Sequence, residues 1–544
     1  MKKKFRCLLA ALLAVSCLVA VLPVQAVASW RFTDVPYNIW YADAVDDLVS
    51  RGILKGKTSS RFDPNGTLTR GEFAAMLARS ALTEDELRQY NYAGTFRDVP
   101  AWARPYVNWV YEAGVADGVG NGRFAPNQGI TREQMAKMVV GFAQATGRQL
   151  DAEQAPVMFT DYHKISSYAT ASVVKCQRAG VINGFPDGSF RPRAVARRCD
   201  AAKLYSGFLE KSYYDGYEIV YKRPGGTAVS AVEIEPHALE AQVTMGNQRV
   251  RGGEHITSVI NRTGAKIAVN GGFFDMGSYD PYGTIINDGK LVTVYNAFSP
   301  AKSSINMDST GWFSVENFST DVTVTVNKED GSQLVAKKAG VNRFPDTPAD
   351  ATRVVFTEDW GGSLGFTPRF AAAVDAWGNV VDVGGKDMYI PEDGFVLAQR
   401  GPRQEDASFF QRIEVGDTID VTHLYIQGDG SELNLDIVTS LAAGPKIVKD
   451  GQAYGNYSTY AAEGLGGIGV DSPARRVCIG IKYDGTVVIL TTVASLPTLS
   501  NIMVSMGCEH AVNLDGGGST NLYVNGKWLY GPQDRLLSNV LYFT

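Results

Sequence analysis

A threefold internal repeat constrains the first part of the chain more than any other feature. The motif "FTDVP" begins at Phe32, "FRDVP" begins at Phe96 and "FTDYH" begins at Phe159, so the period is about 63 residues. In every copy an aromatic residue precedes a glycine by 16 positions, and a phenylalanine follows that glycine by six. Such a period means that one small unit is built three times and that each unit buries its apolar face against its neighbours.

Each copy has the pattern of a helix, a loop and a second helix. Residues 41–56 carry apolar side chains at helical spacing and include Gly52, a residue type that commonly ends helices. Thr69 is the expected N-cap of the second helix, with Glu72 as its capping-box partner. The corresponding motifs are "TREQ" at 131–134 and "ARRC" at 196–199. We expect the three units to form a helical bundle with pseudo-threefold packing.

These repeats resemble surface-layer homology modules, which occur in threes and hold exported proteins to cell-wall polysaccharide. The resemblance implies that an aspartate of the opening motif and an arginine of the second motif line grooves for an acidic, often pyruvylated, secondary wall polymer. An arginine fork suits a carboxylate because it offers two parallel donors; the alternative is that these arginines cap helices or form salt bridges within a module. The third copy departs most, with Ala196 and Cys199, so we expect it to complete the packing only. The matching residues are Asp34, Asp98 and Asp161, with Arg70, Arg132 and Arg197.

The beginning of the chain has the pattern of a secretory signal peptide. Four cationic residues within positions 1–6 precede an apolar run from Cys7 to Val24, and small residues follow at Ala26 and Ala28. We expect cleavage after Ala28 and no stable membrane insertion afterwards; an uncleaved membrane anchor is the alternative. Removal of the four cationic residues changes the net charge from −5 to −9. No long basic tract then remains for a nucleic-acid backbone, so we expect no nucleic-acid binding.

Four cysteines remain in the expected mature chain. They are too few and too widely spaced for a disulfide scaffold or a zinc knuckle. Two disulfides, one joining Cys176 to Cys199 and the other joining Cys478 to Cys508, would respect the domain division proposed below. Small buried free thiols are the alternative.

Beyond about residue 213 the pattern changes from helical to strand-like. Short alternating runs are broken by glycine, as in "KIAVNGGFF" and "VCIGIKYDGTVVILTTV", and "TLSNIMVSMGC" (498–508) is the clearest helical segment. This pattern predicts a mixed α+β domain that is rich in strands. The expected segments are a signal peptide at 1–28, repeat modules at 30–92, 93–157 and 158–212, and the strand-rich domain at 213–544.

Three consecutive glycines in "AVNLDGGGSTNLYVNG" (511–526) lie between two predicted strands. Asn525 and Gly526 form the dipeptide of a two-residue hairpin turn, so the triplet connects two strands and does not open a helix. A Walker loop and a dinucleotide-binding loop both lead into a helix, so neither fits. Glycines allow backbone N–H groups to approach an anion closely, so the triplet could form an anion-binding nest.

Five motifs of the second half resemble, in order and wording, the phosphodiester glycosidase family. That family is related to the enzyme that uncovers mannose 6-phosphate by removing N-acetylglucosamine from a phosphodiester. The resemblance spans about 215–544, and this chain departs from the usual family sequence at Val477-Cys478 and at Thr520. The motifs are "IAVNGGFFD" (267–275), "AAGPKIVKDG" (442–451), "ARRVCIGIKYDG" (474–485), "HAVNLDGGGSTNLYVNG" (510–526) and "RLLSNVLYF" (535–543).

The resemblance implies hydrolysis of a sugar that is joined through C1 to a phosphodiester. Asp515 is the expected nucleophile or base, with an Asx-type hydrogen bond in the loop as its alternative role. Arg476 is expected to clamp the phosphate and to stabilise the charge that develops on it. Asn270 is expected to bind sugar hydroxyls or phosphate, and Glu463 is the second carboxylate. A turn asparagine and a surface glutamate are the alternatives for these two residues.

The remaining expected substrate contacts come mainly from the two glycine-rich motifs. Ser519 and Thr520 offer hydroxyl donors, and His510 is either an acid near neutral pH or a structural residue. We expect no metal and no cofactor, apart from a loop calcium that Asp275 and Asp280 could bind. A Ser-His-Asp triad is not expected, because no serine lies in a Gly-x-Ser-x-Gly elbow. The substrate-binding set is Gly271, Gly272, Gly516, Gly517, Gly518, Ser519, Thr520 and His510.

The expected function is that of an exported hydrolase that is anchored to the cell wall or surface layer. It would cleave a sugar-1-phosphodiester, such as an N-acetylglucosamine-1-phosphate diester, on wall or extracellular glycopolymers. Its partners would be the secondary cell-wall polysaccharide and this substrate. The alternative is a non-catalytic wall polysaccharide-binding or surface-layer protein that keeps the glycosidase fold. A purely structural surface-layer subunit would leave Arg476 and the glycine loop without a role.

Overall fold

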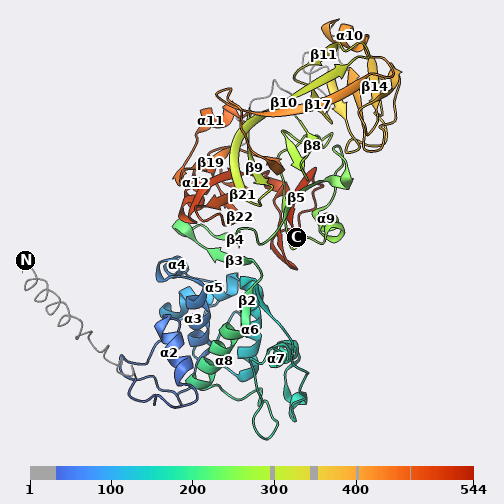
Figure 1. Ribbon diagram of the computed structural model, residues 1–544. Coiled ribbons are helices and arrows are strands. Elements are labelled where there is room, and N and C mark those ends of the chain that lie inside the picture. Colours follow the sequence, from blue (N-terminus) through green and yellow to red (C-terminus); the bar gives the residue numbers. More distant parts are fainter. Residues whose placement is uncertain (1–31, 295–300, 344–352, 400–403, 466, 468) are drawn as a thin grey trace, which may run out of the picture. The chain divides into compact units, whose positions relative to one another are not determined.

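The computed structural model describes residues 32–294, 301–343, 353–399, 404–465, 467 and 469–544 (Figure 1). The predicted signal peptide lies outside the described residues. A helical part is followed by a strand-rich part, as the sequence predicts, and the two form separate compact units. Among the described residues, the repeat unit comprises those within 32–83, Asn91–Phe142 and Leu150–Tyr213, and the strand-rich unit comprises those within Glu84–Tyr90, Ala143–Gln149 and Tyr214–Thr544.

Each copy of the repeat has two α-helices in its described part. Thr69 caps the second helix of copy one: its side chain accepts from the Glu72 N–H at 3.2 Å, and its own N–H donates to Glu72 Oε2 at 2.9 Å. This reciprocal pair is the predicted capping box. The helices are α2 (Ala42–Ser50) and α3 (Arg70–Ala81), then α5 (Arg104–Glu112) and α6 (Arg132–Thr146), then α7 (Ser167–Arg178) and α8 (Arg198–Lys211), with 3-10 turns η1 (Ala101–Ala103) and η2 (Tyr162–Lys164) and short strands β1 (Arg148–Leu150) and β2 (Ser212–Tyr214).

The three copies meet through extended loops at the centre of the repeat unit. The Leu68 N–H donates to the Ala196 carbonyl at 3.0 Å, the Ala196 N–H donates to the Ile130 carbonyl at 2.9 Å, and the Ile130 N–H donates to the Leu68 carbonyl at 2.9 Å. These bonds close a ring of main-chain hydrogen bonds in which each copy contributes one donor and one acceptor. The expectation of an all-helical bundle is therefore not confirmed, because extended backbone and not helix joins the copies here.

An arginine at the start of each second helix locks its copy to the next one. Each guanidinium donates from Nε to the carbonyl of the neighbouring copy's buried phenylalanine, and each lies over that phenylalanine ring at 4.7 to 5.0 Å from its centroid. The bonds are Arg70 to Phe124 at 3.0 Å, Arg132 to Phe190 at 2.8 Å and Arg198 to Phe62 at 2.9 Å.

The predicted equivalence of Arg197 with the other two arginines is wrong. Arg198 takes that position, and Arg197 precedes α8 as its N-cap residue and forms an exposed ion pair with Asp200 at 2.9 Å. The third motif is therefore "RRCD" (197–200), which also places Asp200 where Glu72 stands in copy one. The sequence contains the signal for the correct register, because the arginine follows the repeat glycine by the same interval at 56 and 70, 118 and 132, and 184 and 198.

Two sheets of the strand-rich unit hold the residues that the glycine-rich motifs contribute. The glycine triplet lies in the segment that leaves the first sheet and enters the second. The first sheet has the order β20 (Gln452–Ala453), β19 (Lys446–Lys449), β23 (Cys508–Asn513), β21 (Ala474–Lys482), β22 (Val487–Ala494), β4 (Val229–Ile234) and β3 (Tyr217–Lys222); the second has the order β25 (Lys527–Tyr530), β24 (Leu522–Val524), β6 (Ile267–Asn270), β26 (Asn539–Phe543) and β5 (Ala241–Met245).

Two further sheets build the rest of this unit. Strand β10 alternates buried Val322, Val324 and Val326 with more exposed residues. Its residues 318–327 pair with β17, and the two strands form a long ribbon that leads to the fourth sheet (Figure 1). The third sheet has the order β11 (Gln333–Ala336), β10 (Phe313–Asn327), β9 (Lys302–Asp308), β18 (Ile437–Ala442), β7 (Ile285–Asn287) and β8 (Lys290–Thr293), with β17 (Thr418–Gln427) on β10; the fourth has the order β12 (Gly340–Val341), β13 (Arg353–Phe356), β16 (Phe395–Gln399), β14 (Phe370–Val374) and β15 (Val380–Gly384).

The predicted helix in "TLSNIMVSMGC" is confirmed as α12 (Leu496–Ser505), which packs on the first sheet. Ser495 caps it by accepting from the Thr498 N–H at 3.3 Å. Leu499 and Met503 are fully buried in one core with Leu490, and burial of such side chains contributes about 1.5 to 3 kcal/mol each.

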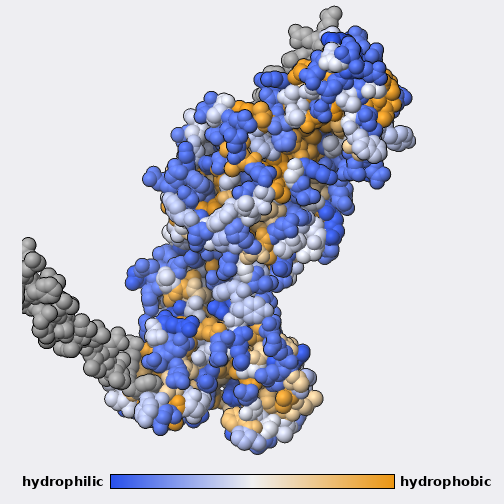
Figure 2. All heavy atoms as spheres, in the orientation of Figure 1, coloured by the Kyte–Doolittle hydropathy of each residue, from blue (hydrophilic) through white to orange (hydrophobic). Residues whose placement is uncertain are grey.

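Hydrophilic side chains dominate the face of the molecule in Figure 2, with apolar side chains in separate patches. The remaining helices are α4 (Glu84–Arg88), α9 (Ile256–Thr263), α10 (Gln404–Phe410) and α11 (Tyr457–Ala462).

The four cysteines of the described chain are buried free thiols, so the disulfide alternative is not supported. Burial raises the pKa of Cys176 and of Cys508 to about 12. These side chains therefore act as small apolar groups within the cores.

Replacement of Arg198 should loosen the centre of the repeat unit. Arg198 is 3% exposed and also donates to the Lys55 carbonyl at 2.6 Å, so Arg198→Ala leaves the buried Phe62 carbonyl and the partly buried Lys55 carbonyl without this donor and should cost about 2 kcal/mol. The matched control Arg197→Ala removes an exposed ion pair and should cost at most about 1 kcal/mol. Hydrogen exchange at the amides of Leu68, Ile130 and Ala196 measures the effect. Equal exchange rates in the two variants would contradict the role given to Arg198.

Candidate functional site

The glycine triplet lies where the chain passes from β23 to β24, as the sequence predicts. The short 3-10 turn η5 (Gly517–Ser519) is the only helical turn of this connection. The predicted hairpin between β24 and β25 is also confirmed, with positive φ at Asn525 and Gly526 (40° and 86°). The loop is therefore held at both ends by strands of different sheets.

Asn270, at the end of β6, cross-links both ends of the glycine loop. Its side-chain Nδ2 donates to the Asp515 carbonyl at 2.7 Å, and its Oδ1 accepts from the Asn521 N–H at 2.9 Å. The side chain is 1% exposed, so both bonds are shielded from water. The structure thus brings Asn270 to Asp515, and the contacts it makes are with the protein main chain.

Asp515 is the partly buried carboxylate at the beginning of the loop. Its N–H donates to the Gly271 carbonyl at 3.2 Å, and its carboxylate is close enough to the Ser519 side chain and the Gly516 N–H for both to affect its pKa. Burial raises the pKa of Asp515, and the hydrogen bond from Ser519, the positive charge of Arg535 and the Gly516 N–H partly oppose that rise. A carboxylate that is costly to ionise and lies at a loop facing solvent has the properties of a functional group.

A different structural constraint favours glycine at each of the three positions of the triplet. A Cβ at position 516 would lie 2.6 Å from the Arg475 carbonyl oxygen, so a side chain there would collide with β21. Gly517 has a φ of +60° and is exposed, with no atom within 4 Å of a Cβ at that position. A Cβ at position 518 would lie 2.7 Å from Nη2 of Arg535. The loop is therefore closely packed on two sides and open at Gly517.

The two glycines after Asn270 serve close packing as well. A Cβ at Gly271 would collide with Oδ1 of Asn539, and a Cβ at Gly272 would collide with the Ala442 carbonyl oxygen. The Gly272 N–H donates to Oδ1 of Asn539 at 2.8 Å. These glycines bring β6, β26 and the end of β18 together beside Asp515.

The hydroxyl groups of the motif are buried. Ser519 and Thr520 are both 0% exposed, and Ser519 Oγ accepts from Nη1 of Arg535 at 3.2 Å. The Ser519 side chain also lowers the pKa of the Asp515 carboxyl, so both Arg535 and Asp515 are near it. Within the described residues, Thr520 Oγ1 is buried without a hydrogen-bond partner.

The structure does not bring the Arg476 side chain to the glycine loop. Arg476 is 5% exposed, and its guanidinium donates to the carbonyls of Ala494 at 3.3 Å, Gly469 at 2.8 Å and Ser472 at 3.4 Å. Burial lowers its pKa. In this geometry the arginine joins β21 to β22 and to the segment before β21.

Glu463 is buried and holds main-chain groups. Its carboxylate accepts from the Ser303 N–H at 2.9 Å and from the Lys446 N–H at 3.3 Å, and it is 7% exposed. Burial raises the pKa of Glu463, and the Ser303 and Lys446 N–H groups and the Lys302 charge partly oppose the rise. The alternative of a surface glutamate is wrong, and the carboxylate ties β9 to β19 rather than facing Asp515.

His510 lies on β23, three residues before that strand ends. Its Nδ1 accepts from the Asp450 N–H at 3.4 Å. That contact is in the turn after β19 and not in the glycine loop.

Arg535 is the charged neighbour of Asp515 that the sequence analysis did not select. It stands at the start of the quoted motif "RLLSNVLYF", in the segment between β25 and β26. Its partner Ser519 is 16 residues away, across a hairpin, so no helical or strand spacing relates the two. The one available signal was that Arg535 is the only charged residue of the quoted family motif.

The described residues contain no group of three or more His, Cys, Asp or Glu side chains that could hold a metal ion. In the predicted calcium loop, Asp275 Oδ1 accepts from the Gly277 and Ser278 N–H groups at 3.0 and 2.7 Å. Asp280 is 3.4 Å from Nε of Arg251. Asp275 is therefore bound by main-chain donors, and Asp280 is paired with the Arg251 charge.

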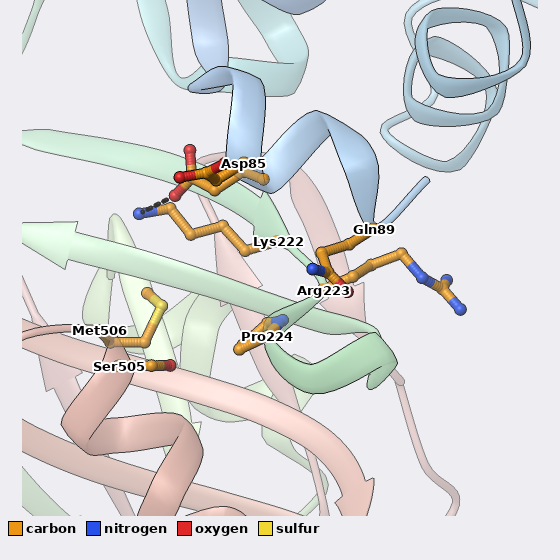
Figure 3. A pocket seen from close by; sticks show the side chains of 8 residues that line it. Asp85, Gln89, Lys222, Arg223, Pro224, Ser505 and Met506 are labelled. Carbon is orange, nitrogen blue, oxygen red and sulfur yellow. Dashed lines mark ion pairs between the residues drawn. The ribbon is translucent and has the colours of Figure 1, made fainter. Parts of the chain in front are cut away.

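A cavity of about 210 Å³ lies elsewhere in the strand-rich unit, between the segment around α4, the end of β3 and the end of α12 (Figure 3). Lys222 forms an ion pair with Glu86 at 3.1 Å at this cavity. None of the predicted site residues lines it. The lining residues are Asp85, Glu86, Gln89, Lys222, Arg223, Pro224, Ser505 and Met506.

The predicted wall-polymer residues of the repeat unit are engaged within the protein. Each aspartate of the opening motif accepts from two main-chain N–H groups of its own copy: Asp34 from Phe62 and Asp63, Asp98 from Phe124 and Ala125, and Asp161 from Phe190 and Arg191, all at 2.8 or 2.9 Å. These N–H groups lower the pKa of all three carboxyls against the opposing effect of burial. Arg70 and Arg132 bind neighbouring carbonyls, whereas the repeated aromatic residues are exposed, at 55% for Trp40, 48% for Trp102 and 53% for Tyr168.

Comparison with known families matches both units. The family described as S-layer homology domain matches residues 31–74, 95–136 and 159–202, and the family described as phosphodiester glycosidase matches residues 369–544. The chain thus carries three S-layer homology modules followed by a phosphodiester glycosidase domain. The second match includes Asp515 but does not reach back to Asn270.

The relatives share limited parts of the chain. An amylopullulanase of Thermoanaerobacterium thermosulfurigenes is 35% identical over 184 residues, which is 33% of this chain and 10% of that protein. The S-layer protein sap of Bacillus anthracis is 37% identical over 116 residues, which is 21% of this chain and 14% of that protein. The chain spans only 10 to 19% of the length of the first-ranked curated relatives.

A solved structure shares the fold. A hypothetical protein from Synechocystis is 21% identical, with a TM-score of 0.50, over 61% of this chain and 62% of that chain. The three S-layer homology modules make this a secreted surface protein. No helix in the described ranges has both the length and the apolar character needed to cross a bilayer.

The raised pKa of Asp515 predicts a pH-dependent contribution to stability. The folded chain binds this proton more tightly than the unfolded chain, so the stability of the wild type relative to Asp515→Asn is fully present below the ordinary pKa of 3.8 and is lost as the pH rises through the raised value. Urea unfolding of both proteins at several pH values measures this difference. A difference that stays constant over this pH range would show that the carboxyl titrates normally.

Proposed function

We propose that this chain is an exported, wall-anchored hydrolase that cleaves a sugar-1-phosphodiester on wall or extracellular glycopolymers. The observation that carries the proposal is the partly buried Asp515 carboxylate at a glycine loop that is open at Gly517. The match to the phosphodiester glycosidase family supports the substrate class. N-acetylglucosamine joined through C1 to a phosphodiester is the representative substrate.

The reaction needs a carboxylate as nucleophile or base, and it does not need a strong acid to protonate the leaving group. When the C1–O bond breaks, its electron pair stays on the phosphate oxygen, which leaves as a stable anion without prior protonation. The ionised Asp515 then either attacks C1 to form a glycosyl ester that water hydrolyses, or takes a proton from the water that attacks C1. In both cases the products are the free sugar and a phosphate monoester.

The environment of Asp515 suits that role. Its pKa is raised, so the carboxylate is more basic than an ordinary aspartate, while Ser519 and Arg535 still favour the ionised form. Asn270 holds the Asp515 main chain and thereby positions the carboxylate. It is a positioning residue and does not itself contact the reacting atoms. Glu463 is left out of the reaction because its carboxylate is bound by two main-chain N–H groups.

The repeat unit is the proposed wall anchor, with the secondary cell-wall polysaccharide as its partner. Arg70, Arg132 and Arg198 hold the copies together, so polymer contact would fall on the exposed surface around them. Trp40, Trp102 and Tyr168 repeat at equivalent positions and are about half exposed. Exposed aromatic rings with a polar edge are suited to recognition of polar partners.

Sugar release tests the catalytic proposal. The full chain should release N-acetylglucosamine from a methyl phosphodiester of N-acetylglucosamine-1-phosphate. Asp515→Asn should lower the rate by about 10³-fold or more, because the variant lacks the nucleophile or base. Asp534→Asn, which changes a fully exposed carboxylate in the segment before Arg535, is the control for charge alone. Binding of the diester with no release by the wild type, across a panel of sugars, would favour the non-catalytic alternative.

Sedimentation with purified cell-wall sacculi tests the anchor. We expect the full chain to bind intact sacculi and to lose most binding once the wall polymer is stripped, because the proposed ligand is the polymer and not peptidoglycan. Trp102→Ala should weaken binding several-fold, whereas Trp377→Ala in the strand-rich unit, 84% exposed, should leave it unchanged. Equal binding to intact and stripped walls would reject the proposed ligand.

A further inference from the structure

A phosphodiester substrate brings a negative charge to the loop beside Asp515, which is itself an anion. A cation must therefore compensate both charges if the two are to approach each other. Arg476 was the expected cation, but the carbonyls of Ala494, Gly469 and Ser472 surround its guanidinium and only 5% of the residue is exposed. The assignment of a phosphate-binding residue rests on the proposed function, and the residue that the geometry around Gly518 favours is Arg535.

Arg535 lies directly against the glycine triplet. A Cβ at position 518 would be 2.7 Å from Nη2, 2.8 Å from Cζ and 3.0 Å from Nε, so the guanidinium occupies the space that a side chain would need. Nη1 donates to Ser519 Oγ at 3.2 Å, which fixes the orientation of the group. Gly518 is thus required by the approach of this cation and not only by the loop conformation.

The guanidinium of Arg535 keeps donors for a ligand. An arginine has five N–H donors, and among the described residues Ser519 Oγ is the one acceptor to which this guanidinium donates. The residue is partly exposed, in contrast to Arg476. Its charge also acts on the Asp515 carboxyl, which places the two groups within electrostatic reach of each other.

The segment that carries Arg535 is held in place from both sides of the loop. The Gln533 N–H donates to Oδ1 of Asn521 at 2.8 Å, and Gln533 Oε1 accepts from Nη1 of Arg475 at 3.2 Å. Arg475 is exposed, and its carbonyl oxygen lies 2.6 Å from the position of a Cβ on Gly516. The Arg535 guanidinium therefore lies beside Gly518, whereas the main chain of Arg475 lies beside Gly516 and its guanidinium binds Gln533, two residues before Arg535.

We propose that Arg535 is the phosphate-binding residue of this site and that Arg475 is a second, more exposed cation for the same anion. The Arg535 fork donates to the non-bridging phosphate oxygens above Gly518, while Ser519 holds the guanidinium in position. In this arrangement Arg535 stabilises the charge that develops on the leaving phosphate close to the Asp515 carboxylate. Arg476 is a structural arginine of the first sheet.

Binding of dimethyl phosphate, a phosphodiester without a sugar, tests the assignment. Calorimetric titration of the full chain should show binding that Arg535→Gln weakens about tenfold or more and that Arg535→Lys weakens less, because lysine keeps the charge without the fork. Gly518→Ala should weaken it as well, since the added Cβ displaces the guanidinium. Arg412→Gln, an exposed arginine near the fourth sheet, is the matched control and should bind as the wild type does.

A second readout separates this role from a merely structural one. Loss of the Arg535 charge should shift the titration of the Asp515 carboxyl, followed by carbon NMR, to higher pH, because that charge favours the ionised form. Wild-type affinity in Arg535→Gln, an equal loss in Arg412→Gln, or no binding by the wild type would each overturn the proposal. If dimethyl phosphate binds through Arg535 but no sugar phosphodiester is hydrolysed, the phosphate site stands and the proposed activity fails.

Discussion

Two hydrogen bonds from the buried side chain of Asn270 fix the geometry of the candidate site. One reaches the Asp515 carbonyl and the other reaches the Asn521 N–H, so a single amide ties the end of β6 to both ends of the glycine loop. The bonds lie away from water, where an unpaired amide or carbonyl costs about 1 to 3 kcal/mol. The position of Asp515 is thus set by satisfaction of buried polar groups, and Asp515 stays partly exposed two residues before the exposed Gly517.

Close main-chain packing explains why glycine is so frequent around this amide. Gly271 and Gly272 admit Asn539 and the Ala442 carbonyl, Gly516 admits the Arg475 carbonyl, and Gly518 admits the Arg535 guanidinium. The loop was expected to expose backbone N–H groups to an anion, but most of its glycines serve contact between protein elements. Anion recognition then depends on the side chain that this packing brings in, which is Arg535.

The repeat unit shows the same relation between motif and architecture. Its recurring aspartates accept from main-chain N–H groups, and its recurring arginines donate to carbonyls of the next copy. A buried charge is stable only when such partners satisfy it. These residues therefore hold together three short helix pairs, each of which would have only a small core by itself. Residues available to a wall polymer are then those left at the surface, such as the repeated aromatic side chains.

The sequence by itself determined the repeat, the capping box of Thr69 and Glu72, the strand-to-strand position of the glycine triplet, the hairpin at Asn525 and Gly526, and helix α12. These features depend on local periodicity and turn chemistry, which lie within a few residues of one another. Tertiary structure alone decided that Arg476 is enclosed by carbonyls, that Glu463 binds main-chain N–H groups, and that Arg535 reaches Ser519 across a hairpin. Such contacts join residues that only folding brings together, and the direction in which a side chain points there is set by burial and by its polar partners, which no spacing along the chain records.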